Sequence, residues 1–119
     1  MSTAVTLYGI SNCDTIRKAR AWLGEHAIDY VFHDYRKQGI DLDLLESMAT
    51  QLGWEQLLNR RGTTWRALPD DAKADVDEAS ALRLMCDNPA LVKRPVLSNH
   101  GRMHLGFSDG QYQEIFESS

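Results

Sequence analysis

Cysteine is scarce in this chain, which holds 2 cysteines in 119 residues. A disulfide scaffold needs several cysteine pairs, so that class of small secreted protein is excluded and reduced thiols are the expectation. No apolar run approaches the roughly 20 residues that span a bilayer. The first residues show no basic segment followed by an apolar stretch, so we expect no secretory signal and a cytoplasmic protein.

An excess of positive charge is also missing. The chain has 13 lysines and arginines against 17 aspartates and glutamates, for a formal net charge of −4. Charge-driven association with phosphates needs a basic surface, so we expect no nucleic-acid partner and no membrane partner. The length corresponds to one domain that can bury a core without disulfides, and we expect a monomer.

Metal ligands are sparse. A structural zinc site needs about four ligands, often with closely spaced cysteines, and no such cysteine pair is present. His100 and His104 lie four positions apart, but Gly101 and the surrounding strand pattern argue against a helical ligand pair. We therefore expect no metal site and no bound cofactor.

Apolar periodicity and turn residues predict alternating strands and helices. The first half reads as strand, helix, strand, which implies parallel strands, and a later hairpin adds antiparallel ones. The predicted fold class is therefore α/β, a mixed sheet flanked by helices. Strands are expected at 5–8, 30–32, 95–97 and 103–105, a polar turn at 36–39, short helices within 54–76, and longer helices at about 13–24, 42–52, 78–87 and 109–117.

Three of these helices have predicted ends and faces. Asn12 is expected to cap the first helix. Asp41 caps the second, whose apolar stripe comprises Leu42, Leu45, Ala49 and Leu52. The third helix should bury one face made of Ala79, Leu82, Met85 and Cys86.

Cys13 stands where a strand has ended and a helix begins. Helix starts expose unpaired N–H groups and partial positive charge, which favour a thiolate and lower the pKa of a cysteine. The alternative is a small buried apolar residue, as most free cysteines are. The polar neighbours Ser11 and Thr15 argue against burial, whereas a carboxylate at Asp14 would raise the pKa unless it points away.

A second cysteine is absent at Ile16, so the two-cysteine redox motif is not present. A single thiolate can form a mixed disulfide but needs an outside thiol to resolve it, most simply glutathione. Cys86 is interpreted as a core residue.

Two basic clusters, at 60–66 and 93–95, could serve an anion. Arg94 stands out because it directly precedes Pro95, and X–Pro bonds can be cis. A guanidinium beside Cys13 would lower the pKa of the thiol and hold an anionic substrate.

Four motifs occur in order along the chain: YGISNCDT at 8–15, DYRKQGI at 34–40, LLNRRGTTWR at 57–66 and KRPVL at 93–97. With them the chain resembles the ArsC family of glutaredoxin-linked arsenate reductases, Spx-type regulators and YffB-like proteins, and most closely the YffB-like branch. The resemblance implies a single domain over 1–119, with a thioredoxin-like core of about 4–40 and 89–119 and a helical insertion of about 41–88.

The resemblance also implies a site. Cys13 and Arg94 would be catalytic, with Arg94 before a cis Pro95, and Asn12, Pro95 and Arg61 would bind substrate or glutathione. Arg60 is the fallback for Arg61.

The chain departs from the arsenate reductases of this family at three positions. Their histidine is Gly9 here, their serine is Ile16, and their third arginine falls near Leu105 and Gly106, with Arg102 close but not matching. These departures favour a glutathione-dependent thiol reductase, with glutaredoxin as a further candidate partner. The alternatives are a glutaredoxin-linked arsenate reductase and a non-catalytic Spx-like regulator that binds transcription machinery.

Overall fold

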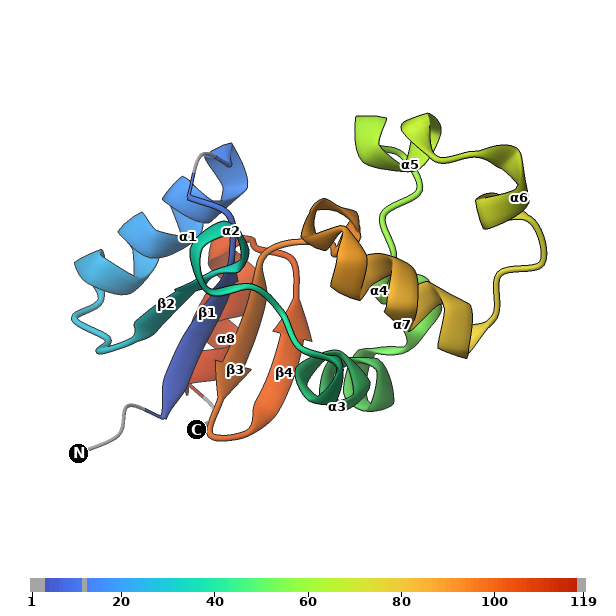
Figure 1. Ribbon diagram of the computed structural model, residues 1–119. Coiled ribbons are helices and arrows are strands. Elements are labelled where there is room, and N and C mark those ends of the chain that lie inside the picture. Colours follow the sequence, from blue (N-terminus) through green and yellow to red (C-terminus); the bar gives the residue numbers. More distant parts are fainter. Residues whose placement is uncertain (1–3, 12, 118–119) are drawn as a thin grey trace. The chain divides into compact units, whose positions relative to one another are not determined.

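The computed structural model describes residues 4–11 and 13–117, which fall into two compact units. The described residues of Met1–Asp34 and Arg94–Ser119 form one, here called the sheet unit. Tyr35–Lys93 forms the other, the helical unit (Figure 1). Among the described residues, no helix combines the length and apolar character needed to cross a bilayer.

The sheet unit contains a four-stranded sheet in the order β2-β1-β3-β4 (Figure 1). β1 pairs with β2 in parallel and with β3 antiparallel, and β3 pairs antiparallel with β4. The mixed sheet predicted from the element order is therefore confirmed. The elements of this unit are β1 (Val5–Gly9), α1 (Asp14–Glu25), β2 (Val31–Asp34), β3 (Val96–Asn99), β4 (Arg102–Leu105) and α8 (Asp109–Glu117).

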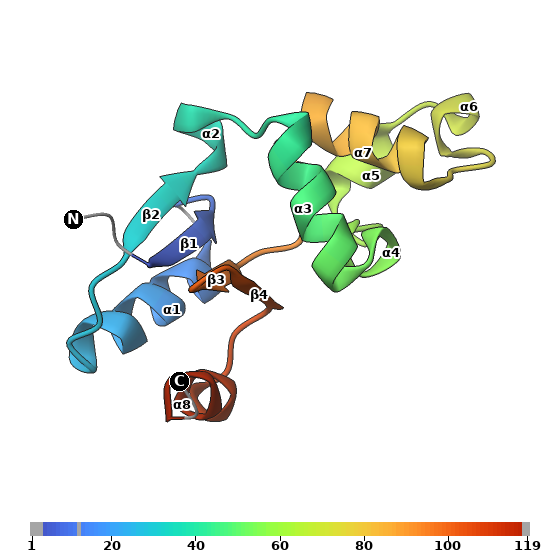
Figure 2. The ribbon, with the colours of Figure 1, turned by 90° about the horizontal axis from the view of Figure 1, so that it is seen from below.

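α1 and α8 both lie on one side of this sheet (Figure 2). β1 alternates buried and half-buried residues, so that Val5 and Leu7 face the helices. Leu7 pairs with Leu97 of β3, and both are fully buried. The helices contribute the rest of this core, with Ala19, Trp22 and Leu23 from α1 and Tyr112 from α8.

The helical unit is built from short, locally capped helices. Asp41 accepts a hydrogen bond from the Leu44 amide, and Asp77 forms a capping box with Ser80. The helices expected at 42–52 and 78–87 and the short ones within 54–76 are confirmed. The unit comprises α2 (Tyr35–Gln38), α3 (Leu42–Leu52), α4 (Trp54–Leu57), α5 (Thr63–Ala67), α6 (Asp70–Lys73), α7 (Glu78–Asp87) and a 3₁₀ turn at Pro89–Leu91.

The junctions between the units lie at 34/35 and 93/94 rather than at the predicted 40/41 and 88/89. Buried Tyr35 directs its hydroxyl toward the Met48 sulfur at 3.9 Å, which ties it to α3. The Lys93 amide donates to the Leu57 carbonyl at 2.8 Å. These long-range contacts assign both segments to the helical unit, whereas the bounds implied by the resemblance were approximate. That both units together make one domain stays a prediction.

Several local expectations are corrected. Helix α1 begins after Cys13, whose extended backbone and carbonyl bond to the Arg17 amide make it the N-cap, while Asn12 lies outside the described residues. Residues 36–38 of the predicted polar turn instead belong to the one-turn helix α2, which ends before Gly39. Leu42 is 47% exposed, and Ala79 is exposed too, because both stand in the first turn of a helix and only the following turns are covered.

Tyr112 is fully buried between aromatic rings. Its ring meets Trp22 and Phe107 edge-on, with centroids at 5.5 and 4.7 Å. The hydroxyl has no hydrogen-bond partner among the described residues, and burial raises the pKa of this tyrosine. A buried polar atom without a partner costs about 1–3 kcal/mol.

Replacing Tyr112 with phenylalanine removes that unpartnered atom and keeps the ring packing. We expect Tyr112→Phe to raise the free energy of unfolding by about 1 kcal/mol, or leave it unchanged. Tyr112→Ala should lower it by about 3–5 kcal/mol. Urea unfolding measures both. A clear loss of stability in Tyr112→Phe would show that the hydroxyl does bond a partner.

Candidate functional site

Cys13 lies where the end of β1 meets the first turn of α1, and its side chain is half-buried. It is the N-cap of this 12-residue helix, so the first amides of α1 point toward its sulfur. The backbone N–H groups of Ile16 and Thr15 lie near the sulfur and lower the pKa of the thiol, although the side chain makes no cap hydrogen bond with ordinary geometry. The position at a helix start, predicted from the sequence, therefore holds.

Arg94 directly precedes Pro95 and β3, and its side chain donates a hydrogen bond to the Cys13 sulfur. The strand register explains this meeting. Tyr8 pairs with Val96, so the residues just before β3 lie beside the end of β1. The Arg94–Pro95 peptide bond is cis, as the resemblance implied. The sheet thus brings together two site residues that are far apart in the sequence.

These neighbours set the protonation of Cys13. Partial burial raises the pKa of the thiol, but the Ile16 amide, the Arg94 hydrogen bond, the Thr15 amide and the Arg94 charge together outweigh it. The net result is a pKa below the ordinary value for cysteine. The Asp14 carboxylate, which could have opposed this, pairs with Arg17 at 2.8 Å on the exposed side of the helix. A thiolate in this position can act as a nucleophile.

Arg60 and Arg61 belong to the helical unit, and their part in the Cys13 site stays a prediction. The Arg60 guanidinium lies over the rings of Trp54 and Trp65, 5.9 and 5.6 Å from their centroids. Arg61 is exposed, and its backbone is held by the side chains of neighbours. Both arginines are exposed, but of the two only Arg60 is engaged on aromatic rings among the described residues, so Arg61 stays the first candidate and Arg60 the fallback.

Arg102 does not lie at the position of the missing third arginine. It pairs with Asn99 next to the β3–β4 turn, whereas Leu105 pairs with Val96 at the other end of the hairpin. Three strand residues correspond to about 10 Å. The end of the hairpin nearest Pro95 therefore presents Leu105 and Gly106, without a cationic side chain on β4.

The sequence predicted that amides at the helix start act on Cys13 but did not name them, and the structure identifies two of them as those of Thr15 and Ile16. The signal for them was the position of Cys13, because an N-cap side chain accepts from the second or third helical amide. A third feature, the bond from the Gly106 amide to the Pro95 carbonyl at 2.9 Å, has no sequence signal, since it joins strands whose register only the fold defines.

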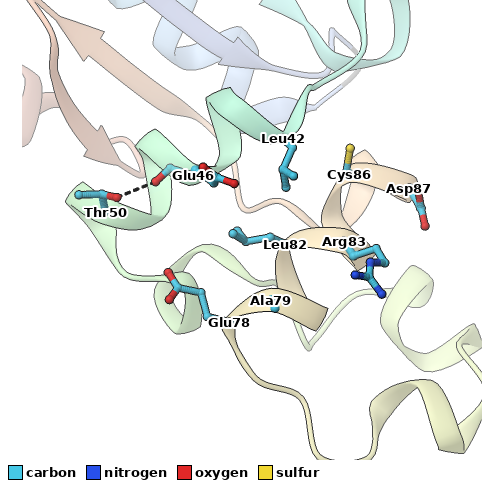
Figure 3. A pocket seen from close by; sticks show the side chains of 9 residues that line it. All are labelled: Leu42, Glu46, Thr50, Glu78, Ala79, Leu82, Arg83, Cys86 and Asp87. Carbon is cyan, nitrogen blue, oxygen red and sulfur yellow. Dashed lines mark hydrogen bonds between the residues drawn. The ribbon is translucent and has the colours of Figure 1, made fainter.

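The helical unit carries a separate cavity of about 540 Å³ between α3 and α7 (Figure 3). Cys86 lines it and is half-buried, with its sulfur 3.5 Å from the Ile40 carbonyl oxygen, so it is not the enclosed core residue expected. No group of three or more potential metal ligands occurs in residues 4–11 and 13–117. The remaining lining residues are Leu42, Glu46, Thr50, Glu78, Ala79, Leu82, Arg83 and Asp87.

Comparison with known proteins identifies relatives along nearly the whole chain. The model of the ArsC family matches residues 8–115. An uncharacterized protein of Haemophilus influenzae is 45% identical over 112 residues, covering 94% of this chain and 98% of the relative. The global transcriptional regulator Spx of Streptococcus pyogenes is 30% identical, covering 90% and 81%.

Solved structures agree with these matches. A structure named YFFB protein is 48% identical with a TM-score of 0.89, covering 92% of this chain and 96% of that one. An arsenate reductase (ArsC) related protein from Brucella melitensis is 52% identical with a TM-score of 0.75, covering 98% of each. The thioredoxin-like mixed sheet predicted from the sequence is thereby confirmed.

Proposed function

Because the chain belongs to the ArsC family, we propose that it is a thiol–disulfide oxidoreductase that uses Cys13 as its single nucleophile and glutathione as co-substrate. One observation carries this proposal: the Cys13 sulfur lies at the start of α1 beside the amides of Thr15 and Ile16 and beside Arg94, which together lower the pKa of the thiol. These groups favour the thiolate over the thiol, and thiolates attack disulfides.

The reaction proceeds by two exchanges. The Cys13 thiolate attacks the glutathione sulfur of a glutathionylated substrate; a new S–S bond forms, the old one breaks, and the substrate leaves as a thiolate that takes a proton from water. A second glutathione thiolate then attacks the glutathione sulfur on Cys13. Oxidised glutathione leaves, and Cys13 departs as the thiolate that its donors stabilise. In sum, the glutathionylated substrate and one free glutathione give the substrate thiol and one molecule of oxidised glutathione, so the disulfide passes from the substrate to glutathione.

Guanidinium groups would bind the carboxylates of glutathione. Arg94 can contact an anion while it remains beside the sulfur, and Arg61, with Arg60 as the alternative, would bind a second carboxylate. Pro95 is buried next to Arg94 and would flank the bound tripeptide. Asn12, the remaining candidate, lies outside the described residues.

Thiol exchange is favoured over arsenate reduction by the donors at the site. A tetrahedral oxyanion needs several fixed donors around it. The described part of the sheet unit supplies Arg94, while Arg102 lies at the far end of its hairpin. A glutathione disulfide needs one activated sulfur and dispersed carboxylate contacts, which this arrangement can provide.

Incubation with oxidised glutathione tests the proposal by intact-protein mass. We expect one glutathione adduct on the wild-type protein and on Cys86→Ser, and none on Cys13→Ser. A coupled assay with a model mixed disulfide should then show turnover that Cys13→Ser lacks, and arsenate should give none. An adduct on Cys86 instead of Cys13 would refute the proposal. If no turnover is observed and Cys13→Ser still binds a protein partner, a regulator related to Spx would be favoured.

A further inference from the structure

The peptide group between Leu105 and Gly106 is held from both sides. Its N–H, on Gly106, donates to the Pro95 carbonyl at 2.9 Å. Its carbonyl, on Leu105, accepts from Nε2 of Gln111 on α8 at 3.1 Å. An antiparallel pair usually exchanges two backbone bonds, but Pro95 has no N–H to return. Of the two backbone hydrogen bonds that such a pair can form, Pro95 and Gly106 therefore form only the one donated by the Gly106 amide.

We propose that the Leu105–Gly106 peptide and the Gln111 side chain are positioning elements that hold Arg94 beside Cys13. This inference rests on the proposed function, since it concerns the same thiolate. Arg94 is joined directly to Pro95, so a fixed Pro95 carbonyl restricts where the Arg94 side chain begins. A small displacement there moves the guanidinium away from a sulfur that it contacts by one hydrogen bond.

Glycine at 106 follows from this arrangement. Its φ of +87° lies in the left-handed region that residues with a Cβ avoid. The chain beyond it is anchored, because Phe107 packs edge-on against Tyr112 with centroids 4.7 Å apart. An alanine at 106 would relieve its strain by rotating the Leu105–Gly106 peptide plane, which carries the N–H away from Pro95.

The β3–β4 turn offers a matched control. Gly101 has a φ of +85°, and a Cβ at either glycine would meet nothing within 4 Å. Gly101→Ala and Gly106→Ala therefore introduce the same backbone strain into the same hairpin, but only Gly106 bonds to Pro95. We expect the pH profile of Cys13 alkylation to shift upward by about half a pH unit in Gly106→Ala, roughly threefold in thiolate fraction. Gly101→Ala should leave the profile unchanged.

A second pair of variants avoids glycine altogether. Gln111→Met keeps the side-chain length but removes the donor to Leu105, and it should shift the profile in the same direction. Its control is Gln113→Met, because exposed Gln113 bonds only to Glu117 among the described residues. Gly106→Asn should restore the wild-type profile, since asparagine tolerates positive φ.

The outcomes separate this inference from the proposed function. If Arg94→Met raises the midpoint of the profile but neither Gly106→Ala nor Gln111→Met exceeds its control, the positioning role is wrong and the activated thiol stands. If Arg94→Met leaves the midpoint unchanged, the activation itself is wrong. The positioning role is established if the midpoint of the profile moves upward in Gly106→Ala and Gln111→Met and does not move in Gly101→Ala or Gln113→Met.

Discussion

Replacing Arg94 with methionine is expected to slow the reaction of Cys13 with oxidised glutathione at least tenfold at neutral pH. Methionine keeps an unbranched, flexible side chain, two atoms shorter than arginine, but supplies neither the hydrogen bond nor the charge that lower the pKa of Cys13. If that pKa rises by about one unit, the thiolate fraction below it falls about tenfold. A more basic thiolate is about threefold more nucleophilic, so activation alone accounts for roughly a threefold loss. The rest of the effect comes from the lost guanidinium–carboxylate contact, worth about 1.5–3 kcal/mol.

Two reagents separate these contributions. Iodoacetamide is neutral and reports thiolate activation alone, so its rate should fall about threefold in Arg94→Met. Oxidised glutathione carries carboxylates and should be slowed more. The difference from wild type should be large below the wild-type pKa, where the protonated thiol dominates both proteins. Above both pKa values both proteins are ionised, and Arg94→Met should then react with iodoacetamide up to about threefold faster than wild type, because its thiolate is more basic.

Arg17→Met is the matched control for Arg94→Met. Arg17 lies on α1 near Cys13, but its guanidinium pairs with Asp14 on the exposed side. An exposed pair of this kind has little influence at a distance in salt. Equal slowing in Arg17→Met and Arg94→Met would mean that net charge, rather than the contact with the sulfur, controls Cys13.

Gly9→Ala is expected to lower the free energy of unfolding by about 1–3 kcal/mol, the usual cost of an extra methyl group in a packed interior. A Cβ on Gly9 would overlap Cδ1 of Ile16 and would lie 2.9 Å from its Cγ1. Ile16 is fully buried, so it has little room to move. Thermal and urea unfolding of the variant measure the loss.

Ile16→Val provides the internal check on this explanation, because valine lacks the Cδ1 atom that causes the overlap. Alone, Ile16→Val should cost about 0.5–1.5 kcal/mol. Combined with Gly9→Ala, it should recover part of the lost stability, giving a favourable coupling in the double-mutant cycle. Additive losses would show that the steric explanation is wrong. Gly24→Ala is a control, since a Cβ at exposed Gly24 meets nothing within 4 Å.

The close approach of Gly9 and Ile16 also explains together two positions at which the chain differs from the arsenate reductases that it resembles. Those proteins are expected to have histidine and serine at these positions. Any side chain at 9 needs a smaller residue at 16, so the two differences amount to one steric exchange beside Cys13. The sequence shows both differences but not that the residues touch.

The sequence by itself determined the features that depend on neighbours along the chain. Asp41 caps its helix as predicted, and α7 spans the predicted Glu78–Asp87, because caps and helical hydrogen bonds join residues three or four positions apart. Cys13 at the start of a helix was predictable for the same reason. The errors were local as well: Asn12 and Cys13 compete for one cap position, and periodicity alone cannot show that Leu42 stays uncovered.

Only the tertiary structure decided what surrounds the sulfur. Arg94 reaches Cys13 because β3 runs antiparallel to β1 in a register that pairs Tyr8 with Val96. The Gly106 amide reaches Pro95 because β4 continues that sheet. Strand register is set by burying one face of the whole sheet against its helices, and a shift of one residue would turn every side chain to the opposite face. The sequence motifs therefore identify the reacting groups, and the packed sheet brings these groups into contact.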